Sequence, residues 1–205
     1  MSSESSQPGL RERKKAAARA NVLEVAHRLF RAEGFDSTTI EQICGEALIS
    51  KRSFFRYFRD KESLVFPKRE ERLSVFVGFL EANRDVDNPF DSLRLATRVF
   101  GAEYNKNKKR LRDQQTVIHS SLVLLSRERE IDQDWQRAIA NAFSARAGNS
   151  PESDLWARVL AGAIMGVVRS TMTFWFDRGC EDDLTQLGLD ALEYLEQGFP
   201  HRAGN

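Results

Sequence analysis

Apolar residues recur at steps of three and four along most of the chain, whereas no segment alternates strictly between apolar and polar residues. This spacing places apolar side chains on one face of an α-helix. The first such run comprises Val22, Val25, Ala26, Leu29 and Phe30. Gly34 is expected to end this helix, with Phe35 as the apolar residue of a Schellman-type cap. Over the whole chain, the pattern predicts an all-α fold of about nine helices.

Short polar segments predict where the next helices begin. Thr38-Thr39-Ile40-Glu41 has the form of a capping box, so a second helix is expected to begin near residue 39. Ser50 can cap a third helix over residues 51–57, and Asp60 can cap a fourth that extends to Leu80. Pro67 falls inside this fourth helix and predicts a kink or an early break.

The C-terminal part of the chain contains further helix starts. Asn88-Pro89 and Ser150-Pro151 each combine a capping residue with proline at the first helical position. Residues 106–147 are expected to hold one or two helices. Residues 152–178 predict the most apolar long helix, and residues 183–197 predict the last one.

Charge is distributed unevenly. The 205 residues have a formal net charge of +1, but residues 1–72 carry fifteen Lys and Arg against eleven Asp and Glu. A basic N-terminal part suggests contact with a polyanion. The Ser-rich first residues and the basic run after them predict a disordered basic arm over residues 1–15.

The few cysteines and histidines limit the chemistry. Two Cys and three His, scattered along the chain, predict neither a disulfide framework nor a metal site, and no cofactor is expected. Residues 1–20 are polar and basic, so no signal peptide is expected. No run of about 18 uninterrupted apolar residues occurs, so we expect no membrane span and a cytoplasmic location.

Residues 50–58, SKRSFFRYF, place aromatic and cationic side chains on one predicted helix. At about 100° per residue, the aromatic side comprises Phe54, Phe55 and Phe58. The opposite side comprises Arg52, Ser53, Arg56 and Tyr57. Guanidinium and hydroxyl groups suit the phosphates and base edges of a DNA groove. Two short helices around a tight turn therefore predict a helix-turn-helix, and the alternative is an ordinary three-helix packing unit.

The flanks of this motif favour an anionic partner. The helix after Thr38-Thr39 is expected to direct free N–H groups outward, as a phosphate site requires. Lys61 lies in a predicted first turn, where a cation opposes the helix dipole unless an anion is bound. The alternative is that Lys61 points into water. Glu41 either closes the capping box or accepts a hydrogen bond from a cytosine amine.

Residues 16–76 resemble the DNA-binding domain of the tetracycline-repressor (TetR) family of transcriptional regulators. The matching positions are Val22-Leu23, Ala26, Leu29-Phe30, Gly34-Phe35, Thr38-Thr39, Ile43, Ala47, Ser50, Tyr57-Phe58, Lys61-Glu62 and Leu64. The resemblance implies a helix-turn-helix at about residues 40–59, a recognition helix at 50–57, and phosphate contacts from Thr39 and Lys61. The expected DNA-binding residues are Thr38, Thr39, Lys51, Arg52, Ser53, Phe55, Arg56, Tyr57 and Lys61.

Three positions depart from the family pattern. Leu48 stands where the turn commonly has glycine. Phe55 stands where a phosphate-binding tyrosine is frequent, so Tyr57 or Ser53 is expected to supply the hydroxyl. Cys44 stands where alanine is usual, and it is expected to pack in the core rather than to sense redox state.

Residues 77–205 resemble the ligand-binding and dimerisation region of the same family. The segment 155–180 resembles the subgroup with acyl-CoA-like ligand-binding domains, which implies a small apolar or acyl-type effector. Small residues in 152–178 and in 183–197 allow close helix approach and predict a homodimer through both helices, matching a palindromic operator. The alternative is an intramolecular helix pair.

Candidate pocket residues combine apolar walls with a few polar groups. They are Phe100, Tyr104, Ile118, His119, Leu122, Trp135, Met165, Arg169, Met172 and Trp175. For each of them, core packing is the alternative, and His119 is expected to be structural. Arg169 interrupts an apolar run, so it is expected to meet a carboxylate, reach the surface or bind an anionic ligand.

These expectations define one function and two alternatives. The chain is expected to be a homodimeric regulator, usually a repressor in this family, that binds a double-stranded DNA operator and releases it when an effector binds. The sequence contains no metal cluster, nucleophile–base motif or glycine-rich phosphate loop, so an enzyme is not expected. The alternatives are a small α-helical enzyme and a helical adaptor that binds protein alone.

Overall fold

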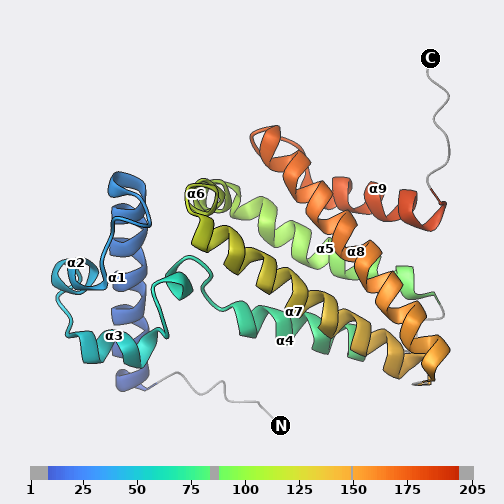
Figure 1. The fold of residues 1–205 in the computed structure, drawn as a ribbon, viewed down its shortest axis with the longest axis horizontal. Helices are drawn as coiled ribbons and strands as arrows, with labels where there is room; N and C mark the ends of the chain where they lie inside the picture. The colour runs from blue at the N-terminus through green and yellow to red at the C-terminus, as the bar shows by residue number, and fades with distance from the viewer. Residues whose placement is uncertain (1–8, 84–87, 149, 199–205) are drawn as a thin grey trace, which may run out of the picture. The chain divides into compact units, whose positions relative to one another are not determined.

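The computed structural model describes residues 9–83, 88–148 and 150–198, and it contains nine α-helices, one 3-10 turn and no strand within them (Figure 1). The predicted all-α fold is confirmed. The chain divides into two compact units. The first unit ends at Pro67 and also includes residues 117–125, and the second unit comprises the remainder. The sequence placed a boundary near residue 76 instead.

The first unit is built from α1 (Leu10–Glu33), α2 (Ile40–Glu46), α3 (Lys51–Tyr57) and the 3-10 turn η1 (Glu62–Leu64). The predicted face of α1 is buried, with all five of its residues at most 7% exposed. The core of this unit also includes Val117, Ile118 and Leu124 from the corner between α6 and α7. Residues far apart in the sequence therefore share one hydrophobic core.

The two ends of α1 differ from their predictions. The helix begins at Leu10, so residues 10–15 are helical rather than a disordered arm, and residues 1–8 lie outside the described residues. At the other end Gly34 has φ 87° and ψ 156°, which is not the left-handed conformation of a Schellman cap. Phe35 is buried as expected, with its ring centroid 5.0 Å from that of Phe30.

A Schellman cap occurs instead at the turn between α2 and α3. The N–H of Ile49 donates to the carbonyl of Cys44 at 3.0 Å, and the N–H of Leu48 donates to that of Gly45 at 3.3 Å. Leu48 takes the left-handed position with φ 54°, and its side chain is 90% exposed. A leucine thus adopts the conformation that glycine adopts most easily. Cys44, at 5% exposed, packs in the core as predicted.

The second unit contains six helices: α4 (Arg69–Ala82), α5 (Pro89–Lys106), α6 (Lys108–His119), α7 (Leu122–Arg146), α8 (Pro151–Asp177) and α9 (Leu184–Glu196), of which α6 and α7 contribute their adjoining ends to the first unit. The predicted caps Asn88 and Ser150 are confirmed by side-chain hydrogen bonds to the following turn. Asp183, where the last helix was expected to begin, caps α9 in the same way. The predicted break at Pro67 is also confirmed, because it lies between η1 and α4.

Two glycines bring α5 and α9 close together. A Cβ atom at Gly101 would lie 2.8 Å from Oγ1 of Thr185, and one at Gly188 would lie 2.7 Å from Cγ2 of Thr97. Any larger residue at either position would push the helices apart. This tight contact fixes α9 along α5.

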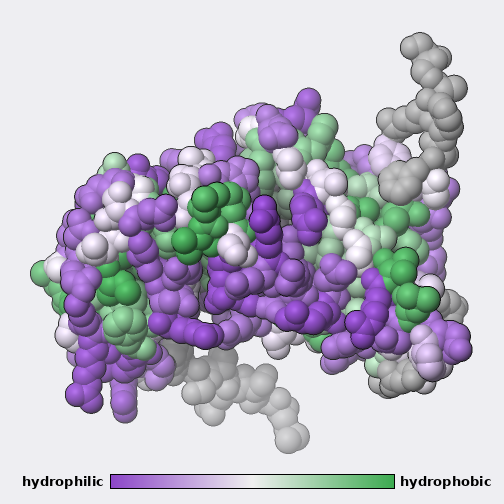
Figure 2. All heavy atoms as spheres, viewed as in Figure 1, coloured by the Kyte–Doolittle hydropathy of each residue, from purple (hydrophilic) through white to green (hydrophobic). Residues whose placement is uncertain are grey.

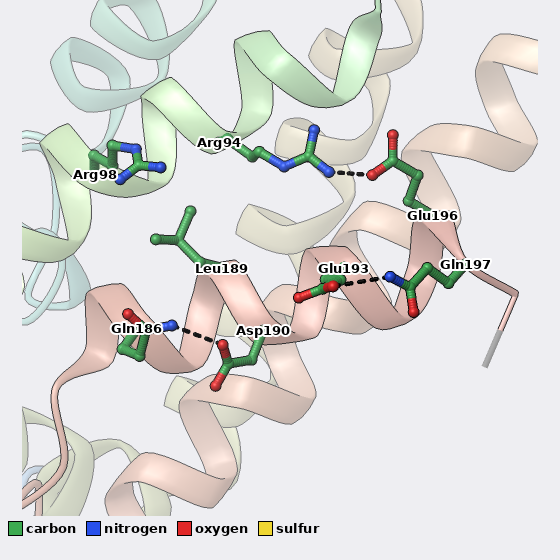
Figure 3. A pocket seen from close by; sticks show the side chains of 8 residues that line it. All are labelled: Arg94, Arg98, Gln186, Leu189, Asp190, Glu193, Glu196 and Gln197. Atoms are coloured by element: carbon green, nitrogen blue, oxygen red, sulfur yellow. Dashed lines mark hydrogen bonds and ion pairs between the residues drawn. The ribbon is translucent and has the colours of Figure 1, made fainter. Parts of the chain in front are cut away.

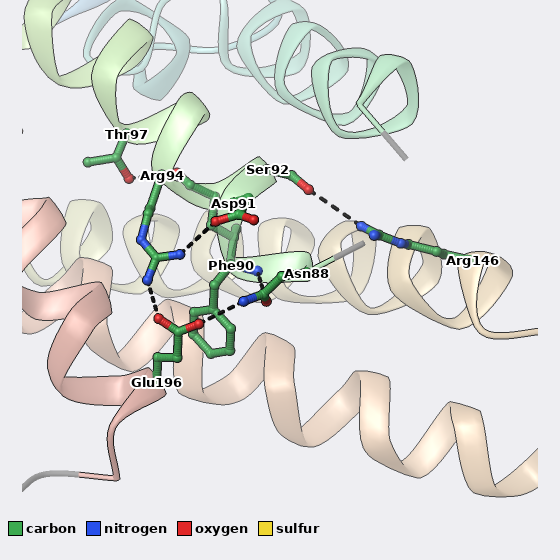
Figure 4. Close-up of polar contacts among 9 residues, drawn as sticks. Asn88, Phe90, Asp91, Ser92, Arg94, Thr97, Arg146 and Glu196 are labelled. Carbon is green, nitrogen blue, oxygen red and sulfur yellow. Dashed lines mark hydrogen bonds and ion pairs between the residues drawn. The ribbon is translucent and has the colours of Figure 1, made fainter. Parts of the chain in front are cut away.

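Glu196 joins the end of α9 to the start of α5 (Figure 4). Its carboxylate accepts a hydrogen bond from Asn88 Nδ2 at 2.8 Å and forms an ion pair with Arg94. The amide of Asn88 and the Arg94 guanidinium together lower the pKa of the Glu196 carboxyl. Arg94 also pairs with Asp91 at 2.8 Å, so its guanidinium forms ion pairs with two carboxylates.

The long helix α8 keeps much of its apolar surface uncovered. Leu155, Val159, Val168 and Phe174 are 46% to 66% exposed. By length and composition alone α8 is apolar enough to cross a membrane, a property it shares with many core helices of soluble proteins. Hydrophobic residues also appear as separate patches on a mainly hydrophilic face in Figure 2.

Candidate nucleic-acid interface

Helix α3 is held by its cap and by two phenylalanines. Ser50 Oγ accepts a hydrogen bond from the N–H of Ser53 at 3.1 Å, which begins the helix. Phe54 and Phe58, one turn apart, are 0% and 3% exposed, and their ring centroids lie 5.5 Å apart. The inward orientation of these two rings is confirmed, and it turns the other side chains of α3 toward solvent.

Phe55 does not share this buried side. It is 55% exposed, and its ring meets the ring of Phe54 edge-on at 5.3 Å. The prediction that Phe55 points inward is wrong because one residue rotates a helix by about 100°, whereas Phe58 follows Phe54 by a full turn. As a result, an aromatic ring lies on the outer surface of α3.

The outer surface of α3 is basic. Arg56 donates from Nη2 to the hydroxyl of Tyr57 at 2.8 Å, and its Cζ lies 4.9 Å from the centroid of that ring. Lys51 forms an ion pair with Glu41, which lowers the pKa of the Glu41 carboxyl. Within the described residues neither Arg52 nor Arg56 has a carboxylate partner. Two guanidinium groups are therefore available to an external anion.

The two threonines before α2 have different positions. Thr39 Oγ1 accepts from the N–H of Gln42 at 3.1 Å, and Gln42 Oε1 accepts from the N–H of Thr39 at 2.8 Å. The capping box is therefore formed one residue later than predicted, and Glu41 does not close it. Thr38 is 1% exposed and its hydroxyl donates to the carbonyl of Gly34 at 2.7 Å. The predicted contact of Thr38 with DNA is wrong because the residue is buried and its hydroxyl is bonded to the backbone of its own unit.

Lys61 is bound by the backbone of its own unit. Its Nζ donates to the carbonyls of Phe35 and Thr38 at 2.7 and 2.8 Å, and it lies 4.2 Å from the centroid of the Phe35 ring. The alternative that Lys61 points into water is therefore wrong. These two hydrogen bonds hold the loop between α1 and α2 and leave one proton of the ammonium group outside them.

Two residues that the sequence did not single out support α2 and α3. Asn21 Nδ2 donates to the carbonyl of Ala47 at the end of α2, at 3.1 Å. Arg19 lies with its Cζ 5.5 Å from the centroid of Phe58. Both residues belong to α1, at positions where polar side chains are expected on a solvent face, so the apolar periodicity carried no signal for either.

The predicted pocket residues near the α6–α7 corner do not line a cavity of the second unit. Ile118 is 2% exposed within the core of the first unit. Leu122 is 83% exposed, and His119 is exposed as well. The prediction grouped these three with the C-terminal helices because apolar spacing does not distinguish one core from another.

Two other predicted pocket residues, Phe100 and Trp135, lie in an aromatic cluster. Phe76 of α4 has its ring centroid 5.6 Å from Phe100 and 5.1 Å from Trp135. Tyr104 follows Phe100 by one turn of α5, and both Tyr104 and Met172 pack against a smaller core cluster that contains Trp175. All of these side chains except Phe76 were predicted, and each is half-buried.

The remaining predicted pocket residues are committed to other contacts. Met165 is 5% exposed, and Trp175 is fully buried with its Nε1 donating to the carbonyl of Asp182 at 2.9 Å. Arg169 pairs with Asp132 of α7 at 3.0 Å while 62% of its side chain is exposed. Arg169 thus meets an acid at the surface, and this pair makes an anionic ligand unnecessary for it.

A solvent-open hollow of about 430 Å³ lies between α5 and α9 (Figure 3). It is lined by Arg94, Arg98, Gln186, Leu189, Asp190, Glu193, Glu196 and Gln197. None of them was a predicted pocket residue. The lining is mainly polar and carries both signs of charge, so this hollow is unsuited to an apolar effector.

Two family models match the chain. Residues 22–66 match the model described as bacterial regulatory proteins, tetR family, and residues 87–200 match the MftR C-terminal domain. The first match covers α2, α3 and η1, and the second covers more than half of the chain.

The chain spans most of the length of two transcriptional regulators to which it is similar. The transcriptional regulator TcmR of Streptomyces glaucescens is 25% identical over 190 residues, covering 89% of this chain and 83% of TcmR. MftR of Mycobacterium tuberculosis is 25% identical over 192 residues, covering 88% and 95%. The fold is also similar to that of FadR from Bacillus subtilis, whose crystal structure is in complex with stearoyl-CoA. The sequences are 18% identical, the TM-score is 0.59, and the match covers 89% of this chain and 99% of the FadR chain.

Proposed function

Since this chain belongs to the tetR family of bacterial regulatory proteins, we propose that α3 is the recognition helix with which it binds an operator as a ligand-responsive repressor. The chain is a DNA-binding transcriptional regulator. The observation that carries the role of α3 is its two-sided structure, with Phe54 and Phe58 buried and Arg52 and Arg56 without an internal acid.

The proposed contacts divide by the chemistry of each side chain. Arg52 and Arg56 are suited to guanine edges or phosphates, and Tyr57 and Ser53 to backbone oxygens. Phe55 offers an apolar ring where the family often has a phosphate-binding tyrosine. Thr39, Lys51 and Lys61 complete the set, and Thr38 is excluded by its burial.

We place the effector in the second unit, which contains the ligand-binding region expected at residues 77–205. The half-buried aromatic cluster of Phe76, Phe100 and Trp135 offers apolar surface to a small apolar or acyl-type molecule. FadR of Bacillus subtilis, whose fold is similar, was crystallised with stearoyl-CoA. DNA binding requires one spacing of the two recognition helices. An effector that favours a different spacing weakens operator binding through this preference.

A palindromic operator requires two copies of the chain, and we place the dimer contact on α8 and α9. The exposed apolar side chains of α8 suit a second copy, whose symmetry matches that of the operator. The proposed protein is a soluble, cytoplasmic regulator without catalytic activity. The competing function is that of an adaptor that binds only protein, and a measurement of DNA binding distinguishes the two.

The test is an operator selected from random duplex DNA with the purified protein, followed by affinities at fixed salt. Arg56→Ala is expected to weaken operator binding by about tenfold to a hundredfold, because one bidentate base contact is worth about 1–3 kcal/mol. Arg98→Ala, an exposed arginine of α5, is the matched control and is expected to bind normally. Unchanged binding by Arg56→Ala, or no selected sequence, would contradict the proposal.

A further inference from the structure

The exposed surface of α3 combines three cations with one aromatic ring. Of the seven residues of this helix, those exposed to solvent are Lys51, Arg52, Phe55 and Arg56. Lys51 and Arg52 precede Phe55 by four and three residues, so their side chains lie beside its ring on the same face of the helix. An apolar group therefore lies within the basic surface that is proposed to enter a DNA groove.

The ring of Phe55 rests on a buried aromatic neighbour. It meets the ring of Phe54 edge-on, with the two centroids 5.3 Å apart and the ring planes at 84°. Phe54 belongs to the core of the first unit and is 0% exposed. Edge-to-face packing is a favourable arrangement of two aromatic rings. Phe54 therefore supports the Phe55 ring from one side, while 55% of Phe55 stays open to solvent.

The chemistry of Phe55 separates it from its charged neighbours. Arg52 and Arg56 can donate hydrogen bonds to phosphates and to guanine, whereas a phenyl ring has no hydrogen-bonding group for either. In the major groove, the apolar group that a base edge presents is the C5-methyl of thymine. A contact between the ring and this methyl group removes apolar surface of both from water. The alternative partner is the carbon surface of a deoxyribose, which is the same in every nucleotide.

We propose that Phe55 is a specificity-determining residue that selects thymine, through its methyl group, at one position of each operator half-site. This inference rests on the proposed function, because it requires α3 to be the recognition helix. It deepens that function by assigning one base of the operator to one side chain. The role also differs from the phosphate contact of a tyrosine, which requires the hydroxyl that Phe55 lacks.

Deoxyuridine substitution in the selected operator tests the proposal, because uracil is thymine without the C5-methyl group. The thymines of the operator are replaced one position at a time, in both half-sites, and the affinity of the unmodified full chain is measured at fixed salt. Replacement at one position is expected to weaken binding by about fourfold for each half-site, the effect of one buried methyl group. This substitution changes only the DNA, so the folding of the protein is not affected.

Variants of Phe55 show whether its side chain senses the methyl group. Phe55→Gln is expected to bind the thymine and uracil operators equally. Phe55→Leu is expected to keep a preference for thymine, because leucine also offers an apolar surface. Val75→Gln is the matched control, since Val75 of α4 is 56% exposed and lies in the second unit. It is expected to leave the preference for thymine unchanged.

Three results would overturn the proposal. A selected half-site without thymine would leave Phe55 no methyl group to contact. Equal binding of every uracil operator by the unmodified protein, with weaker binding by Phe55→Gln, would assign the ring to a deoxyribose. A preference for thymine that persists in Phe55→Gln would assign the methyl group to another side chain. A specific operator would still support the proposed function in all three cases, whereas failure to select any operator would contradict both proposals.

Discussion

Leu48 combines two unfavourable properties in the turn between α2 and α3. Its φ of 54° lies in the left-handed region, and 90% of its side chain is exposed. Outside glycine, this conformation costs about 1–2 kcal/mol because Cβ approaches the following carbonyl. The Schellman hydrogen bonds of Ile49 and Leu48 itself maintain the conformation despite this cost.

Leu48→Gly is expected to stabilise the first unit by about 0.5–1 kcal/mol, the relief of strain less the entropy that glycine adds to the unfolded chain. Urea unfolding monitored by circular dichroism measures the change. Leu48→Ala removes a similar apolar surface but keeps the strained conformation, so it is expected to show no such gain. Equal effects of both substitutions would mean that exposure, and not backbone strain, sets the cost.

Single side chains were the least predictable part of the candidate interface. The sequence identified Phe54 and Phe58 as buried anchors because their spacing equals one helical turn. It wrongly predicted that Thr38 is exposed to DNA. A threonine before a helix either caps that helix, as Thr39 does, or donates to an earlier carbonyl, as Thr38 does, and the sequence does not distinguish the two neighbouring positions. It also did not indicate that Lys61 binds two carbonyls, because those carbonyls belong to a loop 23 and 26 residues earlier in the chain.

Helix boundaries were predicted well where capping chemistry decides them. Asn88, Ser150 and Asp183 cap the helices that they were expected to begin. Pro67 lies between η1 and α4, as expected for a residue that cannot continue the hydrogen-bond ladder of a helix. Which helices pack together was not predictable, since the contact between α5 and α9 depends on two glycines whose partners lie more than 80 residues away.

The bridge at Glu196 makes the α5–α9 pairing depend on pH. Because hydrogen bonds from Asn88 and Arg94 lower the pKa of this carboxyl below its ordinary value of 4.5, its stabilising effect is complete above pH 4.5. The effect is lost as pH falls through the lower, folded-state pKa. Glu196→Gln is therefore expected to lower the melting temperature at pH 7, with a difference that shrinks below pH 4.5.

Thermal unfolding of the two proteins between pH 7 and pH 3 checks this trend. Glu193→Gln is a suitable control, because Glu193 accepts a hydrogen bond from Gln197 and has no arginine partner among the described residues. A melting difference for Glu196→Gln that persists unchanged to pH 3 would contradict the proposed role of the charge.

In the whole molecule, several apolar side chains of α8 are not covered by the second unit. Leu155, Val159 and Phe174 are exposed although their helix is among the most apolar of the chain. The sequence predicted a self-complementary contact here from small residues, and the second compact unit leaves the same helix available to a partner copy. Apolar periodicity alone did not separate this surface from an internal helix pair.

Val159→Arg is expected to convert the dimer to a monomer, because it places a charge in the proposed contact, where it would be desolvated without a partner. Native mass spectrometry and sedimentation give the stoichiometry. Val75→Arg introduces the same charge at a position on α4 with similar exposure, 56% against 64%, and is expected to leave the dimer intact. A dimer that survives Val159→Arg would place the contact elsewhere.

The three tryptophans of the chain, Trp135, Trp156 and Trp175, all belong to the second compact unit. Indole emission is therefore blind to the unit that contains α3, while ellipticity at 222 nm records both. Melting curves taken with the two optical signals will coincide if the halves of this protein unfold together, and will separate if each half unfolds on its own.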